Sequence, residues 1–388
     1  MKFYHIADVH LGAVPDRTMP WSKERARGLY ESFYRLLARA KEEQIDVVFI
    51  CGDLFHRQPL KRELKELNYH FEKAAPVLIF IIAGNHDHIT EESNYVNYPW
   101  SKNVKLITPD HCQRVYIEHL KLCVYGFSYH SYEIFEAVYD GIKPQLSDGR
   151  GGSLPLDCCH ILMAHGGDEK HIPMHFNTMA SSGFDYIAMG HIHKPWLKPS
   201  GKMAYSGSLE PVDQTDEGPH GFIEGETLGR HVNIRFIPFA QWNYASLSVD
   251  VDPSMSWEAV KDQVRAAAEC FGAASGFTSK GLLKYGAGGA GQPGIGSGNR
   301  NIYKVILKGY KNVDLAYDIE EIYRLGNIVS VVDEMEYDFD FESLYEANRG
   351  NLLGRYIEKV WAMDIDEDMQ KKILYYGFNA LYKTRSDT

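Results

Sequence analysis

Short apolar runs alternate with amphipathic stretches along the first 240 residues of the chain. The runs KFYHIA, IDVVFIC and VLIFIIA are rich in β-branched and aromatic residues and have the length of buried strands. Between them, residues 24–44 and 60–74 repeat apolar side chains at the spacing of one helical face. These side chains are Leu29, Phe33, Leu36, Leu37 and Ala40 in the first stretch, and Leu60, Leu64, Leu67 and Phe71 in the second. Strands that alternate with helices predict a βαβαβ opening and a largely parallel sheet covered by helices.

Later strands follow one another more closely. RVYIEHLKLCVYGFSY has the pattern of a hairpin, and the apolar runs HILMAHG, FDYIAMGH, KMAYSGS, GFIEGE and HVNIRFIPF follow it. The last of these runs are joined by short turns, which favours antiparallel pairing. We therefore expect an α/β fold over residues 1–240, with two mixed layers packed as a β-sandwich and flanked by helices.

A second pattern begins near Trp242. Strand-like and helix-like stretches predict a β-α-β-α-β unit over residues 241–345, and residues 346–388 are helical in character. A Gly-rich stretch at 275–299 interrupts the unit, and we interpret it as a flexible surface insertion because it lacks the GK[ST] ending of a phosphate loop. The apolar residues at 353–381 either clamp a partner or fold back onto their own domain; their place after a complete second domain favours a partner.

Composition limits the class of protein. Hydrophobic residues make up 44% and charged residues 24%, as in ordinary globular proteins, and no apolar run is long enough to span a membrane. The six cysteines lack CxxC spacing and the N-terminus does not resemble a signal peptide, so we expect a cytoplasmic, reducing location. The net charge of −11 argues against a protein that coats nucleic acid by itself. It leaves a DNA substrate open, since bound dications would add local positive charge.

Five short polar motifs stand at the ends of apolar strands. They are DVH with Asp8 and His10, GDLFH with Asp53 and His56, GNHD with Asn85 and His86, AHG with His165, and GHIH with His191 and His193. Residues two apart on a strand point to the same side, so each D-x-H or H-x-H pair can reach one ion together. Mixed nitrogen and oxygen ligands fit two divalent metal ions of the first transition row. Mn²⁺ suits them best, Fe²⁺ and Zn²⁺ are alternatives, and Mg²⁺ alone suits four imidazoles less well. Each motif alone is weak, but all five in this order are highly specific.

Taken together, the motifs make the chain similar to the calcineurin-like metallophosphoesterase superfamily over residues 1–240. Within it, HIADVHLG, GDLFH and the run at 206–211 resemble the SbcD/Mre11 family of DNA-repair nucleases. The resemblance implies a four-layer α/β/β/α sandwich, a DNA-capping domain at 241–345, and a segment at 346–388 that binds an SbcC/Rad50-like coiled-coil ATPase. The Gly-rich insertion departs from a compact cap.

The resemblance also implies roles for individual residues. Asp8, His10 and His193 would hold the first ion, Asn85, His165 and His191 the second, and Asp53 would bridge both. A hydroxide between the ions would attack phosphorus, and His86 would act as general acid at the leaving oxygen. His56 would contact phosphate, although an ordinary surface-loop histidine is the alternative. Asp87 is expected to shape the turn.

The leading hypothesis is a Mn²⁺-dependent DNA nuclease that works with an SbcC/Rad50-like ATPase. A metallophosphatase or cyclic-nucleotide phosphodiesterase for small substrates is the enzymatic alternative. The second domain and the tail argue against it, because a small substrate needs neither. A non-catalytic metal-binding scaffold is the other alternative, although it would not need His86. The stripe from Leu60 to Phe71 is either core or the face of a homodimer, and its spacing is more typical of core.

Overall fold

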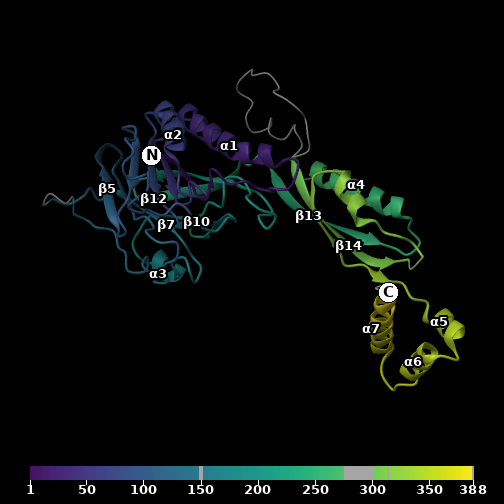
Figure 1. Ribbon diagram of the computed structural model, residues 1–388. Coiled ribbons are helices and arrows are strands. Elements are labelled where there is room, and N and C mark those ends of the chain that lie inside the picture. Colours follow the sequence, from purple (N-terminus) through teal and green to yellow (C-terminus); the bar gives the residue numbers. More distant parts are fainter. Residues whose placement is uncertain (148–151, 275–299, 313, 387–388) are drawn as a thin grey trace. The chain divides into compact units, whose positions relative to one another are not determined.

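The computed structural model describes residues 1–147, 152–274, 300–312 and 314–386 (Figure 1). The expected insertion at 275–299 lies outside the described residues. The chain divides into two compact units, one built mainly from Met1–Ser246 and the other from Leu247–Ala274 and the segment that starts at Val305.

The first unit contains two six-stranded sheets. In the first sheet the strand order is β12-β11-β1-β2-β3-β4, and the run from β1 to β4 is parallel, as the βαβαβ pattern predicts. The strands are β1 (Lys2–Ile6), β2 (Val47–Cys51), β3 (Leu78–Ile82), β4 (Val104–Ile107), β11 (Gly221–Leu228) and β12 (His231–Pro238). The last two pair antiparallel with each other, and β11 pairs antiparallel with β1.

The second sheet has the order β5-β6-β7-β8-β10-β9. Its strands are β5 (Gln113–Ile117), β6 (Leu122–Gly126), β7 (Cys159–His165), β8 (Tyr186–Gly190), β9 (Trp196–Leu197) and β10 (Met203–Tyr205). The expected hairpin is β5 and β6, joined by the short 3-10 helix η1 (Glu118–Leu120). The strands β6, β7, β8 and β10 run parallel, so this sheet is mixed like the first.

Side chains that alternate along each strand of the first sheet pack into two different apolar layers, one on each face of the sheet. In β2, Val48 and Ile50 pack against the helices α1 (Ser22–Glu42) and α2 (Lys61–Ala74), which lie side by side on this sheet (Figure 1). Val47, Phe49 and Cys51 of the same strand point the other way, into the apolar layer between the two sheets. The short helix α3 (Phe176–Ala180) and the loops around it cover the outer face of the second sheet. The predicted four-layer sandwich is therefore confirmed.

The apolar stripe of α2 belongs to the core. Leu64, Leu67 and Phe71 are fully buried in the layer between the helices and the first sheet, and only Leu60 is exposed. The core interpretation of this stripe is correct, and a homodimer would need a different surface.

The second unit contains a small sheet with the order β13-β14-β15, in which β16 also pairs with β14. Its elements are β13 (Asn243–Val251), α4 (Trp257–Ala274), β14 (Asn301–Lys311), η3 (Ile319–Leu325), β15 (Ile328–Asp333) and β16 (Glu336–Tyr337). The second predicted helix is thus a 3-10 helix. Three helices follow: α5 (Phe341–Asn348), α6 (Leu352–Trp361) and α7 (Glu367–Ser386). Among the described residues, no helix combines the length and the apolar character that crossing a bilayer requires.

Candidate metal centre

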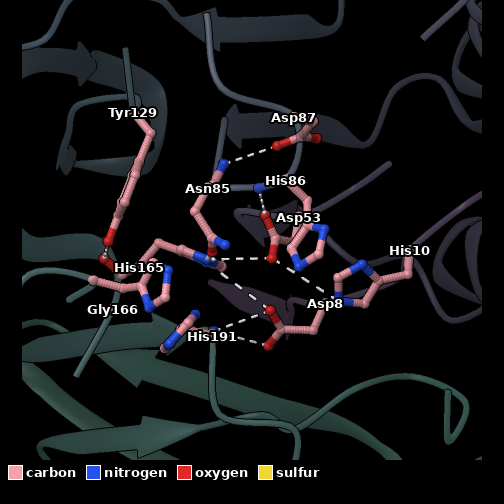
Figure 2. Close-up of polar contacts among 12 residues, drawn as sticks. Asp8, His10, Asp53, Asn85, His86, Asp87, Tyr129, His165, Gly166 and His191 are labelled. Atoms are coloured by element: carbon pink, nitrogen blue, oxygen red, sulfur yellow. Dashed lines mark hydrogen bonds and ion pairs between the residues drawn. The ribbon is translucent and has the colours of Figure 1, made fainter. Parts of the chain in front are cut away.

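The polar motifs meet where strands of both sheets end (Figure 2). Asp8 follows β1, Asp53 follows β2 and Asn85 follows β3, while His165 ends β7 and His191 follows β8. Because the carboxyl ends of parallel strands lie at the same edge of a sheet, residues that are distant in sequence converge there. All of these side chains except that of His191 are almost completely buried.

Four of the candidate ligands have a strained backbone conformation. Asp8, His10, Asp53 and His191 have φ values of 51°, 49°, 49° and 98°. Positive φ is uncommon for residues other than glycine, costs on the order of 1–3 kcal/mol, and clusters at functional sites. The chain therefore places these side chains at an energetic cost.

Asp8, His10 and His193 form the first group of candidate ligands. The Nε2 atoms of His10 and His193 lie 3.0 Å apart. The Asp8 carboxylate accepts the backbone N–H of His191 at 3.0 and 2.9 Å, which fixes it at the same place. Two imidazole nitrogens that face each other at this distance beside a buried carboxylate suit a shared cation.

Asp53, His165 and His191 form the second group. The Nδ1–H of His165 donates to the carbonyl of Cys51 at 2.9 Å, so Nε2 is the nitrogen that can offer a lone pair to a cation. That Nε2 lies 3.1 Å from Oδ1 of Asn85 and 3.5 Å from Oδ2 of Asp53. Asn85 thus joins the second group as an oxygen ligand.

Asp53 lies between the two groups. Its Oδ2 is 3.5 Å from Nε2 of His165 in the second group and 3.9 Å from Nε2 of His10 in the first. Its Oδ1 accepts the backbone N–H of His86 at 2.9 Å. The position suits a carboxylate shared by two ions.

The ionisable groups of this buried cluster shift one another's pKa values. Burial raises the pKa of Asp8 to about 6. Burial acts against ionisation of Asp53 too, but His165 and other imidazoles outweigh it and hold its pKa below the ordinary value. Burial lowers the pKa of His165, yet Asp53 beside it raises the result to about 9. A cation that binds here would replace an imidazole proton as the partner of the carboxylates, as metal ligation requires.

The two remaining site histidines, His86 and His56, are more exposed than most of the candidate ligands and lie at the rim of the ligand cluster. His86 is half-buried, and its ring stands edge-on to that of His10 at 4.9 Å and nearly parallel to that of His56 at 5.0 Å. His56 is exposed, and its Nδ1 lies 3.4 Å from Nδ1 of His10. Burial, followed by the neighbouring His86, lowers the pKa of His56. Asp87 is buried and accepts hydrogen bonds from the backbone of Phe55 and Gly84, which agrees with the expected turn-shaping role.

Sequence reasoning missed two carboxylates. Asp168 accepts a hydrogen bond from Nε2 of His191 at 2.7 Å, and Asp216 accepts one from Nδ1 of His193 at 3.0 Å. Both stand in loops, where no periodic pattern marks a residue. The only available signal was that Asp168 follows His165 by three residues in the AHGGD segment.

The donor set fits divalent transition metal ions. It consists of imidazole nitrogens, carboxylates and one amide oxygen, which suits Mn²⁺, Fe²⁺ and Zn²⁺. Among the described residues no cysteine belongs to these groups, so the site does not resemble a structural zinc cluster.

The chain is similar in sequence to several known proteins. The chain is 32% identical over 226 residues to the DNA double-strand break repair protein Mre11 of Methanocaldococcus jannaschii, which covers 55% of this chain and 57% of that protein. It is 24% identical over 284 residues to the uncharacterized metallophosphoesterase YhaO of Bacillus subtilis, covering 68% and 66%. Mre11 of Archaeoglobus fulgidus is 28% identical over 242 residues, covering 55% and 51%. The matches thus span between about half and two thirds of these relatives.

The family match covers every candidate ligand of the metal centre. Residues 1–195 match the model for calcineurin-like phosphoesterase, and they include all seven candidate ligands, whereas Asp216 lies beyond the matched range. Such a family acts on phosphoesters and implies divalent metal ions, which the His and Asp groups described here could hold. Since the match covers half of the chain, the chain belongs to the calcineurin-like phosphoesterase family.

Proposed function

We propose that the chain is a two-metal DNA nuclease that hydrolyses phosphodiester bonds, with Mn²⁺ as the best-suited ion. The observation that carries the proposal is the position of Asp53, whose Oδ2 lies between the imidazoles of His10 and His165. A single carboxylate shared by two ligand groups is the arrangement that two-metal hydrolysis of phosphate esters uses.

In this proposal Asp8, His10 and His193 would hold the first ion, Asn85, His165 and His191 would hold the second, and Asp53 would serve both. When bound, two such ions supply Lewis-acid polarisation of the phosphoryl group and activation of the attacking water. The protein contributes the ligand geometry, since most of these ligands are buried and several directly follow strands.

His86 is the proposed general acid. Its Nδ1–H donates to the carbonyl of His56 at 3.3 Å, which leaves Nε2 as the nitrogen that can deliver a proton to the leaving oxygen. A group with this role typically contributes about 10²–10⁴-fold to the rate. His56, exposed beside His86, is proposed to contact the substrate phosphate.

DNA is the proposed substrate because relatives named as DNA double-strand break repair proteins match the chain over more than half of its length. An exposed aromatic ring, Trp196, and the exposed Lys194 follow directly after the ligand His193, and rings and cations of this kind favour nucleic-acid strands. We further propose that residues 1–240 are the nuclease domain, that 241–345 form the cap, and that 346–388 bind an SbcC/Rad50-like ATPase.

A hydrolysis assay tests the proposal. Purified protein with Mn²⁺ should degrade linear DNA, EDTA should stop the reaction, and Asp53→Ala should remove it. Hydrolysis of p-nitrophenyl phosphate esters with no cleavage of any DNA would replace the nuclease by the small-substrate phosphoesterase. Bound Mn²⁺ without hydrolysis of either substrate would leave the scaffold function.

A further inference from the structure

Each imidazole that faces the centre from the second sheet has a partner on its other ring nitrogen. For His165 this partner is the backbone carbonyl of Cys51. For His191 it is a side chain, because Nε2 lies 2.7 Å from Oδ2 of Asp168. For His193 the partner is also a side chain, but it contacts the other ring nitrogen: Nδ1 lies 3.0 Å from Oδ2 of Asp216.

These contacts determine which ring nitrogen of each histidine is available to bind a cation. An ionised carboxylate can only accept, so the nitrogen that faces it carries the hydrogen, and in the neutral ring that binds a cation the other nitrogen keeps its lone pair. Asp168 therefore leaves Nδ1 of His191 free for a cation, whereas Asp216 leaves Nε2 of His193 free. The second assignment agrees with the position of Nε2 of His193, 3.0 Å from Nε2 of His10.

Both carboxylates are themselves held by the backbone. Asp216 is buried and also accepts the N–H of Val212 at 2.8 Å. Asp168 is more exposed, and it accepts the N–H groups of Lys170 at 2.8 Å and of His171 at 2.9 Å. Each carboxylate thus has a defined orientation before any cation binds.

We propose that Asp168 and Asp216 are positioning residues of the metal centre, and that each one serves a different ion. Asp216 sets the tautomer and orientation of His193 and so supports the ion that Asp8 and His10 share. Asp168 does the same for His191 and supports the ion near His165. The inference rests on the proposed two-ion centre, but it does not depend on which substrate the centre cleaves.

The effect of each carboxylate on its ion follows from the chemistry of the carboxylate–histidine pair. A carboxylate on the distal nitrogen makes the ligating nitrogen a stronger donor and prevents ring rotation, and its loss typically weakens metal binding about 10- to 100-fold. In an Asp→Asn variant, the amide can donate where the carboxylate accepted. That favours the wrong tautomer, with the ring hydrogen on the nitrogen that should face the ion.

Mn²⁺ titration of the metal-stripped full chain tests the proposal without an activity assay. Free Mn²⁺ is followed by electron paramagnetic resonance, and heat by calorimetry. The native chain should bind two Mn²⁺, and Asp168→Asn and Asp216→Asn should each weaken one of them about 10- to 100-fold. Matched controls from the same loops are Glu169→Gln and Asp213→Asn, which do not contact a histidine ligand and should keep both affinities.

A double-mutant cycle identifies which ion is affected. Asp216→Asn combined with His193→Ala should cost no more than His193→Ala alone, because the first change acts only through the second residue. Asp168→Asn combined with His193→Ala should instead add its own loss. A purely structural role would weaken both ions together and give no such selectivity.

The outcomes separate this inference from the proposed function. Unchanged affinities in both variants, or equal weakening of both ions by either variant, would overturn the inference. A native chain that binds fewer than two Mn²⁺ would overturn it together with the two-ion centre. Selective weakening in a protein that cleaves no DNA would support the inference and refute the nuclease.

Discussion

Asp53 accepts the backbone N–H of His86 at 2.9 Å, so one turn holds both the shared carboxylate and the proposed proton donor. The hydrogen bond comes from the backbone of His86, so the imidazole takes no part in it and stands edge-on to His10. Ligand geometry and proton delivery can therefore be separated by mutation at this one position.

His86→Ala should keep both ions and lose most turnover. The variant retains the backbone N–H that fixes Asp53, but it lacks the imidazole, so the rate of DNA cleavage should fall about 10²–10⁴-fold. Metal content and single-turnover cleavage rates measure the two effects. His111→Ala, which removes an exposed imidazole, is the control and should change neither. Loss of metal from His86→Ala would place His86 among the ligands instead.

Gly84 lies against the centre with no room for a side chain. A Cβ there would approach Oδ1 of Asp53 to 2.2 Å and Nε2 of His165 to 2.7 Å. It would also lie 2.6 Å from the backbone nitrogen of Asp53, which cannot rotate away as a flexible side chain could.

Gly84→Ala should therefore displace Asp53 and weaken binding of both ions at least tenfold. Calorimetric titration with Mn²⁺ measures the loss. Gly141→Ala is the matched control, since a Cβ at Gly141 meets no atom within 4 Å and its affinities should stay native. Native affinity in Gly84→Ala would mean that the turn relaxes without moving the shared carboxylate.

Metal binding should stabilise the first unit. An ion that binds only the folded state at a concentration of 100 Kd adds about 2.7 kcal/mol to the free energy of unfolding. The Tm should thus rise with Mn²⁺ and fall with EDTA, as scanning calorimetry can measure. Asp53→Ala should remove most of the response because Asp53 is close to both ligand groups. A response of native size in this variant would contradict a shared role for Asp53.

The centre could be predicted from sequence because its residues are tied to strand ends. Asp8, Asp53 and Asn85 follow buried parallel strands, and the parallel arrangement alone brings them to one edge. Asp168 and Asp216 could not be predicted, because a loop residue reaches its partner along a path that has no periodicity. Their contacts with His191 and His193 depend on how these two loops fold.

Periodicity also predicted apolar faces without identifying what they bury. In the C-terminal helices, Ile357, Val360 and Leu374 pack on one another, so part of the face expected for a partner forms an internal core. The segment 319–325 was expected to be an α-helix and is a 3-10 helix. It is seven residues long and ends before Gly326, and so short a stretch gains few i→i+4 hydrogen bonds.

Exposed apolar residues of α7 offer a test of the proposed ATPase contact. Met369 and Tyr376 are exposed and lie seven residues apart, so they share one face of the helix. Tyr376→Ala should reduce co-purification of an SbcC/Rad50-like ATPase and leave DNA cleavage by the isolated chain unchanged. Lys371→Ala, on a different face of α7, is the control. Full co-purification after Tyr376→Ala combined with Met369→Ala would remove this face from the interface.

A buried histidine connects the two sheets of the first unit. His5, on β1, is fully buried, and its Nε2–H donates to the carbonyl of Met189 on β8 at 3.1 Å. Its Nδ1 then accepts from the hydroxyl of Tyr186 at 2.8 Å. Burial lowers the pKa of His5 to about 3, so the folded state holds this imidazole neutral.

Stability should therefore fall as the pH falls. The unfolded chain binds a proton at His5 below pH 6.5 and the folded chain does so only near pH 3, so the contribution is present above pH 6.5 and is lost toward pH 3. Between pH 7 and pH 5 the loss should be about 2 kcal/mol, since each pKa unit corresponds to about 1.4 kcal/mol. Urea unfolding in EDTA, which excludes pH-dependent metal binding, measures this loss. His5→Gln should flatten the pH dependence by that amount, whereas His231→Gln, at an exposed position on β12, should leave it native. An equal slope in His5→Gln and the native chain would show that His5 is not the group that acid protonates on unfolding.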